Sequence, residues 1–226
     1  MLYGAYAAPA LAVTPFGRKI FDATTTTGDD SSVVLTFDDG PHHVATPKLL
    51  EVLDETSTRV TFFLVGEQVQ RAPDVAAEIV RRGHEVGCHG FVHRNHLARP
   101  PRDTYNDLVR SRDMIEDVCG VRVPYFRPPY GVFNYASWRT CRALGMQPIL
   151  WSRWTRDWEE RASKHSIVSG ATVDLRGGEI VLLHDADTYS APASHDDTIA
   201  AVPDIVAYVK SIGLQTSTLG AALTRA

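Results

Sequence analysis

The adjacent aspartates Asp38 and Asp39 directly follow an apolar, β-branched run from Val33 to Phe37. Removing a carboxylate from water is costly unless a cation or hydrogen-bond donors compensate it, so a buried pair of this kind needs a positive partner. Taken alone, Asp-Asp-Gly is most often a turn. The pair is therefore a candidate for chemistry only if other polar groups gather beside it.

His89 and His93 are candidate partners for these carboxylates. Two neutral imidazoles and one carboxylate form a ligand set that suits Zn²⁺ or another borderline divalent cation. The spacing H-x-x-x-H differs from the metalloprotease motif H-E-x-x-H, because Gly90 stands where that motif has its general base. Either Asp38 or Asp39 could supply the base, with the other binding the metal. Considered one at a time, such histidines are more often surface or hydrogen-bonded core residues.

Three further segments carry polar residues that could join this group. They are Arg127-Pro128-Pro129-Tyr130-Gly131, Arg156-Asp157-Trp158 and His184-Asp185. The first segment could also be only a rigid end of a strand, with Arg127 in contact with solvent. In the second segment, Asp157 could cap a following helix and Trp158 could lie in the core. The third is uninformative by itself. The chemical interpretation depends on a fold that brings the segments together.

The elements that must position these residues are parallel βα units. Short β-rich apolar runs alternate with segments of helical apolar spacing, which is the sequence pattern of such units. The expected strands are Val33 to Phe37, Arg59 to Val65, Glu85 to Cys88, Tyr125 to Arg127, Gln147 to Trp151, Ile180 to His184 and Leu214 to Thr218. The expected helices are Pro47 to Glu55, Pro73 to Arg82, Arg102 to Val118, Tyr135 to Leu144 and Thr198 to Ile212, with Gly83, Gly120, Gly145 and Gly213 as stops.

We therefore predict an α/β fold, a distorted barrel of about seven parallel strands. Barrels of this kind carry their chemistry where strands run into the following loops. The polar segments described above follow the ends of five expected strands, so their side chains should meet at one mouth. This joint placement favours chemistry over the separate structural interpretations.

Length and composition describe one ordinary globular domain. The chain has 226 residues, of which 44% are hydrophobic and 22% charged, and these values exclude disordered, collagen-like and coiled-coil chains. A net charge of -4 offers no basic surface for phosphate backbones, so nucleic acid is not an expected partner. Cys88, Cys119 and Cys141 are too few for a disulfide scaffold and show no C-x-x-C spacing.

The N-terminal segment, residues 1–31, is expected to lie outside the folded domain. The run from Leu2 to Val13 is uncharged, but Pro9 interrupts it and it is shorter than the roughly 20 residues of a spanning helix. It is either the remainder of a signal or membrane anchor, giving a membrane or envelope association, or a helix packed on the barrel or lying at an interface. The Thr-rich stretch from Thr24 to Ser32 is expected to be a flexible linker.

The chain resembles the polysaccharide deacetylases, carbohydrate esterase family four, also called the NodB homology domain. The resemblance runs from about Val33 to Leu219 and makes residues 32–226 the catalytic domain. The first family motif appears as Thr36-Phe37-Asp38-Asp39-Gly40-Pro41. The second to fifth motifs are similar to His89-Gly90-Phe91-Val92-His93, Arg127-Pro128-Pro129-Tyr130-Gly131, Asp157-Trp158 and Leu182-Leu183-His184-Asp185.

The resemblance implies a role for each of these positions. It implies a metal bound by Asp39, His89 and His93, with Asp38 as general base and His184 as general acid. It further implies supporting roles: Arg127 orients Asp38, Asp157 partners His184, Leu182 and Trp158 form an apolar slot for the acetyl methyl, and the Tyr130 backbone N–H stabilises the oxyanion.

The implied function is that of a metal-dependent hydrolase. It would remove N-acetyl groups from an N-acetylglucosamine-containing glycan, such as peptidoglycan, a chitin oligomer or a surface polysaccharide. Zn²⁺ is the expected metal, with Co²⁺, Ni²⁺ and Mn²⁺ as alternatives, and no organic cofactor is expected. The alternatives are an O-acetyl esterase on xylan or a hydrolase of small cyclic amides. A non-catalytic sugar-binding domain is disfavoured because the base, the acid and all three metal ligands are present.

A cell-wall substrate would place the protein in the cell envelope or outside the cell. The oligomeric state is not specified by the sequence. Two positions depart from the family pattern: Gly90 replaces a Ser or Thr whose hydroxyl steadies the second histidine, which predicts weaker metal binding, and Trp154 replaces an often acidic residue. With Trp151 and Trp158, Trp154 either stacks on sugar rings or fills the core. His42 and His43 are expected to be turn residues.

Overall fold

The computed structural model describes residues 14, 17, 21–97 and 99–226. The interpretations of Leu2 to Val13 concern residues outside this range. Within the described part of the chain, no helix is both long and apolar enough to cross a membrane.

Strands and helices alternate along the chain, as the sequence predicted. In chain order they are β1 (Ser32–Asp38), α3 (Ala45–Glu55), β2 (Thr61–Leu64), α4 (Gly66–Arg71), α5 (Pro73–Arg81), β3 (Glu85–Cys88), α6 (Pro101–Cys119), β4 (Tyr125–Phe126), the 3₁₀ turn η2 (Pro129–Gly131), α7 (Tyr135–Ala143), β5 (Gln147–Pro148), β6 (Arg153–Trp154), α8 (Lys164–Thr172), β7 (Ile180–His184), α9 (Ser194–Ser211), β8 (Gln215–Ser217) and α10 (Leu219–Arg225).

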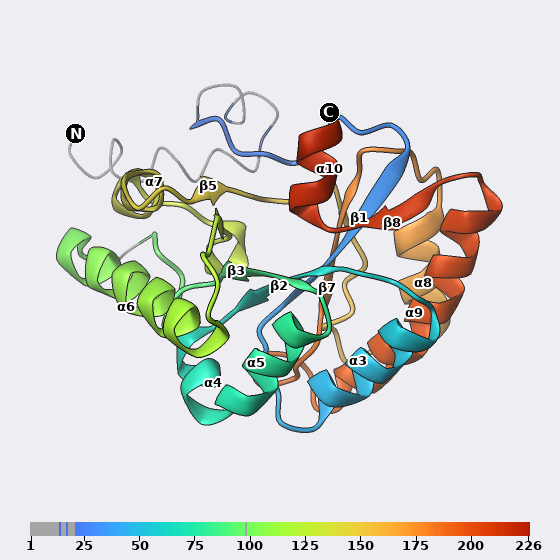
Figure 1. The fold of residues 1–226 in the computed structure, drawn as a ribbon, viewed down its shortest axis with the longest axis horizontal. Helices are drawn as coiled ribbons and strands as arrows, with labels where there is room; N and C mark the ends of the chain where they lie inside the picture. The colour runs from blue at the N-terminus through green and yellow to red at the C-terminus, as the bar shows by residue number, and fades with distance from the viewer. Residues whose placement is uncertain (1–13, 15–16, 18–20, 98) are drawn as a thin grey trace.

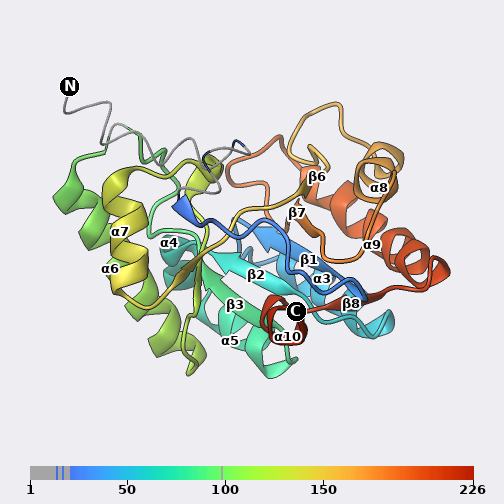
Figure 2. The ribbon, with the colours of Figure 1, turned by 90° about the horizontal axis from the view of Figure 1, so that it is seen from above.

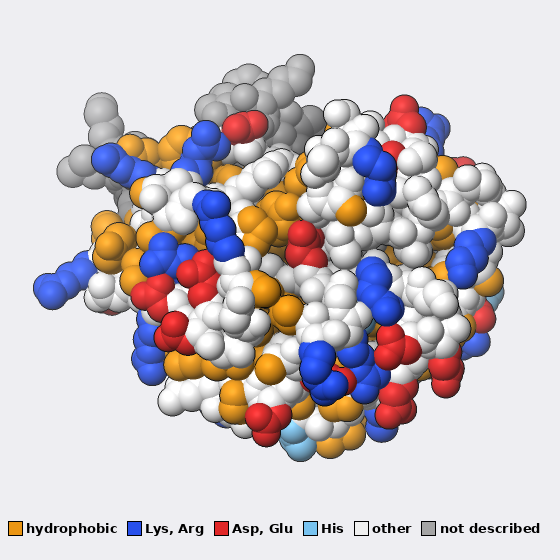
Figure 3. Space-filling model, in the orientation of Figure 1, with side chains coloured by type: hydrophobic (Ala, Val, Ile, Leu, Met, Phe, Trp, Pro, Cys, Tyr) orange, Lys and Arg blue, Asp and Glu red, His pale blue; other side chains and the backbone are white. Residues whose placement is uncertain are grey.

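The strands form one parallel sheet that curves into a half-barrel. Their order is β5-β4-β3-β2-β1-β7-β6, with β8 also paired to β1. Figure 1 shows α6, α4, α5, α3, α9 and α8 in an arc around the outside of the strands, and Figure 2 shows the same layers from above. The predicted α/β barrel-type fold is confirmed. Charged side chains of both signs are interspersed on the face of the molecule seen in Figure 3.

Side-chain alternation along β1 determines which residues face the inside of the half-barrel. Val33, Leu35 and Phe37 belong to the large core between the strands and the outer helices. Val34 belongs to a smaller cluster with Phe63, Tyr125, Ile149 and Ile180, which Leu219 and Ala222 of α10 cover. Because successive side chains of a strand point to opposite faces, Thr36 and Asp38 share the inner face with Val34. Burying an aromatic side chain such as Phe37 stabilises the fold by about 1.5–3 kcal/mol.

Several expected elements differ in the structure. The expected strand from Gln147 to Trp151 is replaced by β5 and β6, which lie at opposite ends of the sheet. A strand of only two residues, Arg153 and Trp154, has no periodic pattern that the sequence could show. The short helices α4, α8 and α10 were not expected. The four predicted glycine stops are confirmed, each lying within two residues of the end of a helix.

The Thr-rich stretch expected to be a linker is attached to the sheet. The backbone of Thr24 donates to Pro148 and accepts from Leu150, and the Thr27 N–H donates to the Gly178 carbonyl. The Asp29 carboxylate accepts hydrogen bonds from Ser31, Ser32 and Arg225. The expectation of a flexible linker is wrong here, because hydrogen bonds with distant parts of the chain override the local composition. The division at residue 32 otherwise stays a prediction.

Candidate active site

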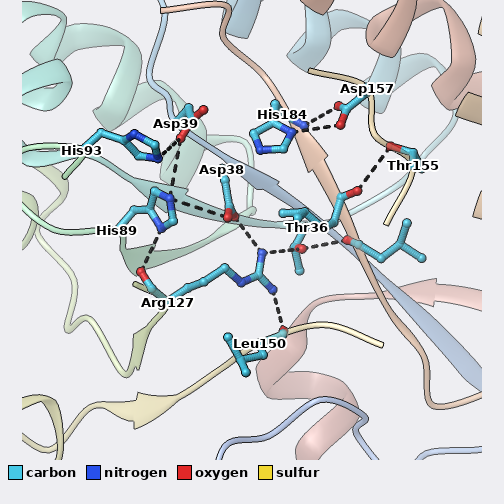
Figure 4. Close-up of polar contacts among 12 residues, drawn as sticks. Thr36, Asp38, Asp39, His89, His93, Arg127, Leu150, Thr155, Asp157 and His184 are labelled. Atoms are coloured by element: carbon cyan, nitrogen blue, oxygen red, sulfur yellow. Dashed lines mark hydrogen bonds and ion pairs between the residues drawn. The ribbon is translucent and has the colours of Figure 1, made fainter. Parts of the chain in front are cut away.

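The polar residues selected from the sequence lie at the carboxyl ends of the strands. Asp38 is the last residue of β1 and stands in register with His184, the last residue of β7. His89 directly follows β3, and Arg127 directly follows β4. Asp157 follows β6, and not the longer fifth strand that the sequence predicted. The expected gathering of reactive side chains at one mouth is confirmed (Figure 4).

Asp39, His89 and His93 form a group that could hold a metal ion. One ligand atom from each lies within 4.8 Å of the others. The Asp39 Oδ1 is 3.3 Å from the His93 Nε2 and 3.6 Å from the His89 Nε2. This oxygen is buried and has no hydrogen-bond partner among the described residues. An unpartnered buried carboxylate oxygen that faces two imidazole nitrogens fits a cation binding between them.

The electrostatics of the three residues agree with this interpretation. Burial, together with the neighbouring carboxylates of Asp38, Asp185 and Asp157, raises the pKa of Asp39 to about 7 although His184 opposes the shift. Burial and the neighbouring His89 lower the pKa of His93 to about 3, and burial with the Arg127 charge lowers the pKa of His89 well below its usual value. Both imidazoles are therefore neutral, which is the form that binds metals. The donor set fits a divalent cation such as Zn²⁺.

Arg127 connects the metal candidates to Asp38. Its side chain is fully buried, and its Nη1 donates to Asp38 Oδ1 at 2.7 Å and to Thr36 Oγ1 at 2.8 Å. Its backbone carbonyl accepts a hydrogen bond from His89 Nδ1 at 2.8 Å. Because a carbonyl can only accept, His89 carries its proton on Nδ1 and presents the Nε2 lone pair to the aspartates. Burial raises the pKa of Asp38 while the Arg127 charge opposes that rise.

His184 and Asp157 form a second hydrogen-bonded pair in the site. The His184 Nδ1 donates to Asp157 Oδ1 at 2.9 Å, and the His184 backbone N–H donates to Asp157 Oδ2 at 2.8 Å. Thr198 also donates to this carboxylate. Burial alone would lower the pKa of His184, but the carboxylates of Asp157, Asp39 and Asp38 raise it to about 10. The imidazole therefore holds its proton at neutral pH.

A cavity of about 220 Å³ opens above these groups. Its wall is mainly aromatic and apolar. The lining residues are Asp38, Asp39, His89, His93, Tyr130, Gly131, Trp151, Trp154, Trp158, Leu182, His184, Tyr189 and Ser190. The site therefore combines polar groups at its floor with an apolar wall, which is the usual composition of a ligand pocket.

The two sides of the cavity differ in exposure. Leu182 is buried and Trp158 is half-buried, and the Trp158 ring is 5.3 Å from that of His184. Tyr130 is 60% exposed and has a φ of 61°. Trp154 is 50% exposed and neighbours Trp151 and Trp158. This exposure does not fit the interpretation of Trp154 as a core filler, and stacking on a sugar ring stays a prediction.

His42 and Gly90, near the opening of the cavity, have structural roles in the backbone around it. The Nδ1 of His42 accepts from the backbone N–H of Ala45 at the start of α3, which agrees with the expected turn position. Gly90 has a φ of 85°, a conformation in which side chains are strained, and an added Cβ would lie 3.1 Å from Asp107 Oδ2.

Tyr189 was not selected from the sequence. It lies in the loop after β7, where no motif or periodic pattern marks it.

A parallel half-barrel in which carboxylates and three imidazoles converge on one cavity has the architecture of a hydrolase whose site could hold a metal ion. The model of the polysaccharide deacetylase family matches residues 25–149, which is more than half of the chain. The chain therefore belongs to the polysaccharide deacetylase family, carbohydrate esterase family four, and is one of its hydrolases.

Named relatives and a solved structure agree with this membership. The chain is 30% identical to a chitooligosaccharide deacetylase of Azorhizobium caulinodans, over 84% of this chain and 94% of that protein. It is 33% identical to a peptidoglycan-N-acetylglucosamine deacetylase of Bacillus cereus, over 82% of this chain and 84% of that protein. A family 4 acetyl xylan esterase of Clostridium thermocellum, solved in complex with a cobalt ion, has a TM-score of 0.77 and 26% identity, covering 85% of this chain and 90% of that chain.

Proposed function

We propose that this protein removes N-acetyl groups from a glycan that contains N-acetylglucosamine, such as peptidoglycan or a chitin oligomer. The observation that carries the proposal is the convergence of Asp39, His89 and His93 with Asp38 and His184 on one cavity. The names of the two relatives, which act on chitooligosaccharide and on peptidoglycan N-acetylglucosamine, support this substrate class.

Asp39, His89 and His93 would hold a divalent metal ion. When bound, this ion supplies Lewis acidity that polarises the acetyl carbonyl and makes a water molecule easier to deprotonate. Zn²⁺ suits the donor set, and the cobalt ion of the xylan esterase structure supports a borderline divalent metal.

Asp38 is positioned to accept the proton of the attacking water. Arg127 fixes the Oδ1 of Asp38 and leaves Oδ2 on the side of His89, at 3.7 Å from its Nε2. The raised pKa of Asp38 makes it a stronger base than an exposed aspartate. The oxygen of the deprotonated water then bonds to the acetyl carbon, and the backbone N–H of Tyr130 donates to the developing oxyanion.

His184 is positioned to donate a proton to the departing nitrogen. Asp157 holds the Nδ1 of the imidazole, so its Nε2 is the atom that faces the cavity. The bond between the acetyl carbon and the amide nitrogen breaks as this nitrogen takes the proton. The products are acetate and the free amino sugar, and the slot formed by Leu182 and Trp158 receives the methyl group.

Acetate release tests the proposal. The protein, loaded with Zn²⁺, is incubated with N-acetylglucosamine oligomers, with peptidoglycan and with acetylated xylan. We expect acetate from an N-acetylglucosamine substrate. Acetate from xylan alone would favour the O-acetyl esterase alternative, which the xylan esterase relative supports. Release of acetate from neither, by protein that has bound metal, would contradict both.

The same substrate class suggests the location of the protein. Peptidoglycan and surface polysaccharides lie outside the cytoplasmic membrane, so we propose that the protein acts in the cell envelope or outside the cell. An acetylated glycan is its proposed partner. Fractionation of producing cells tests this location, which would be contradicted by protein found wholly in the cytoplasmic fraction.

A further inference from the structure

The two histidines of the candidate metal centre are held in different ways. The Nδ1 of His89 donates to the backbone carbonyl of Arg127, and this bond directs its Nε2 toward the aspartates. The Nδ1 of His93 is buried and forms no hydrogen bond with another residue in the part of the chain that the structure describes. In Figure 4 the contact drawn from His93 goes to Asp39. A metal-binding histidine normally has its second ring nitrogen held by a partner, so another contact must orient this ring.

Aromatic rings supply that contact. The Tyr189 ring stacks on the His93 ring with centroids 4.4 Å apart and planes inclined by 16°. The Tyr130 ring contacts the same imidazole at 4.6 Å with an inclination of 53°. The near-parallel Tyr189 stack restricts rotation of the His93 ring, because turning the imidazole would drive its edge into the tyrosine.

Two hydrogen bonds fix the hydroxyl of Tyr189. Its hydroxyl donates to Glu67 Oε1 at 2.7 Å and accepts from Gln68 Nε2 at 2.9 Å. Both partners belong to α4. The first residues of α4 are bonded to the loop that carries the two histidines, because the N–H groups of Gly66 and Glu67 donate to the carbonyls of Gly90 and Phe91.

These contacts connect His93, through Tyr189 and α4, to the loop that carries His93 itself. The histidine loop is bonded to α4, α4 is bonded to the Tyr189 hydroxyl, and the Tyr189 ring stacks on His93. Gly90 has no side chain that could reach the imidazole, and its φ of 85° disfavours one. These contacts can therefore orient the His93 ring, as the hydrogen bond to the Arg127 carbonyl orients the His89 ring.

We infer that Tyr189 is a positioning residue that orients His93 for metal binding by ring stacking. The inference rests on the proposed metal site. Loss of a contact that orients a metal ligand typically weakens metal binding by about 10–100-fold. The aromatic ring should matter more than the hydroxyl, since the ring makes the contact with His93.

Co²⁺ affinity of three variants tests this inference. Metal-free wild type, Tyr189→Leu and Tyr189→Phe are titrated with Co²⁺ in competition with a chelator, and the visible absorption of the bound ion is recorded. Tyr105→Leu is a matched control, because Tyr105 lies on α6 and is 51% exposed. Thermal unfolding of the metal-free proteins checks that each variant is folded.

We expect Tyr189→Leu to bind Co²⁺ about 10–100-fold more weakly with a changed absorption spectrum. Tyr189→Phe should keep the wild-type spectrum and an affinity within a few-fold, and Tyr105→Leu should equal the wild type. A folded Tyr189→Leu with wild-type affinity and spectrum would overturn the inference, and so would a Tyr189→Phe as impaired as Tyr189→Leu. Acetate release by the wild type tests the proposed function separately, because Co²⁺ binding requires no substrate.

Discussion

The guanidinium of Arg127 donates a 2.7 Å hydrogen bond to the carboxylate of Asp38, and the two side chains are 0% and 3% exposed. Arg127 comes from the end of β4 and Asp38 from the end of β1, so the pair joins two strands that are not neighbours in the sheet. The Arg127 side chain also rests on the Phe63 ring at 4.0 Å. The pair therefore connects the packing inside the half-barrel to the position of the proposed base.

Arg127→Leu should destabilise the protein. The substitution leaves Asp38 buried without its cation, and breaking a buried ion pair in this way costs about 3–5 kcal/mol. Urea unfolding monitored by circular dichroism measures the change in the free energy of unfolding. The double variant Arg127→Leu with Asp38→Leu, which leaves no buried charge unpaired, should be more stable than Arg127→Leu alone. Equal stability of the wild type and Arg127→Leu would contradict this description of the pair.

Asp38→Asn and His93→Ala should separate proton transfer from metal binding. Asp38→Asn removes the proposed base and should lower kcat by about 10²–10⁴-fold while the metal content stays near that of the wild type. His93→Ala removes a proposed ligand and should lose the metal. Elemental analysis after dialysis, combined with acetate release, measures both effects. The assignment of roles is wrong if Asp38→Asn alone loses the ion.

Trp154→Ala should weaken glycan binding. The half-exposed ring lies at the cavity rim, where it can stack on a sugar, and an aromatic stack of this kind contributes about 0.5–1.5 kcal/mol. We expect KM for an N-acetylglucosamine oligomer to rise about 2–12-fold with little change in kcat, because the ring does not contact the reacting bond. Trp154→Phe serves as the control and should retain most of the affinity. An unchanged KM in Trp154→Ala would show that the ring makes no contact with the glycan.

His84 should make the stability of the fold depend on pH. It lies far from the cavity, is 4% exposed, and accepts a hydrogen bond from the Val60 N–H through its Nδ1. Burial and the charge of Arg59 lower the pKa of His84 from 6.5 to about 4. The unfolded chain therefore binds a proton at a higher pH than the folded one. The contribution of His84 to the free energy of unfolding is therefore fully present above pH 6.5. It decreases as the pH falls from 6.5 to about 4, by about 3 kcal/mol in total.

His84→Gln removes this titration. Urea unfolding between pH 4 and pH 7 should show a flatter pH dependence for His84→Gln than for the wild type. His165→Gln, the same substitution at an exposed position, is the matched control for the exchange of histidine for glutamine itself. If the free energy of unfolding of His84→Gln depends on pH as steeply as that of the wild type, His84 is not the source of the pH dependence.

The features predicted correctly from the sequence are those with a strong local pattern. The apolar run before His184 gave strand β7, and the apolar run before Asp38 gave strand β1. Because parallel strands end at the same edge of a sheet, the prediction of parallel βα units already placed Asp39, His89 and His93 at one edge, where the structure has them.

The features that the sequence did not predict depend on distant contacts. Strand β6 consists of Arg153 and Trp154, and its pairing with β7 leaves no pattern in two residues. Thr24 has the neighbours of a linker but is bonded to Pro148 and Leu150. Tyr189 contacts His93, which lies 96 positions earlier in the chain, and no spacing rule connects them. Local propensity cannot specify such contacts, because the tertiary fold determines them.

Diffraction at the zinc absorption edge from crystals soaked in Zn²⁺ tests the central claim most directly. We predict one anomalous peak bonded to the Asp39 carboxylate and to the Nε2 atoms of His89 and His93, at about 2.0–2.2 Å from each. A map in which these three side chains point apart with no peak between them would contradict the account.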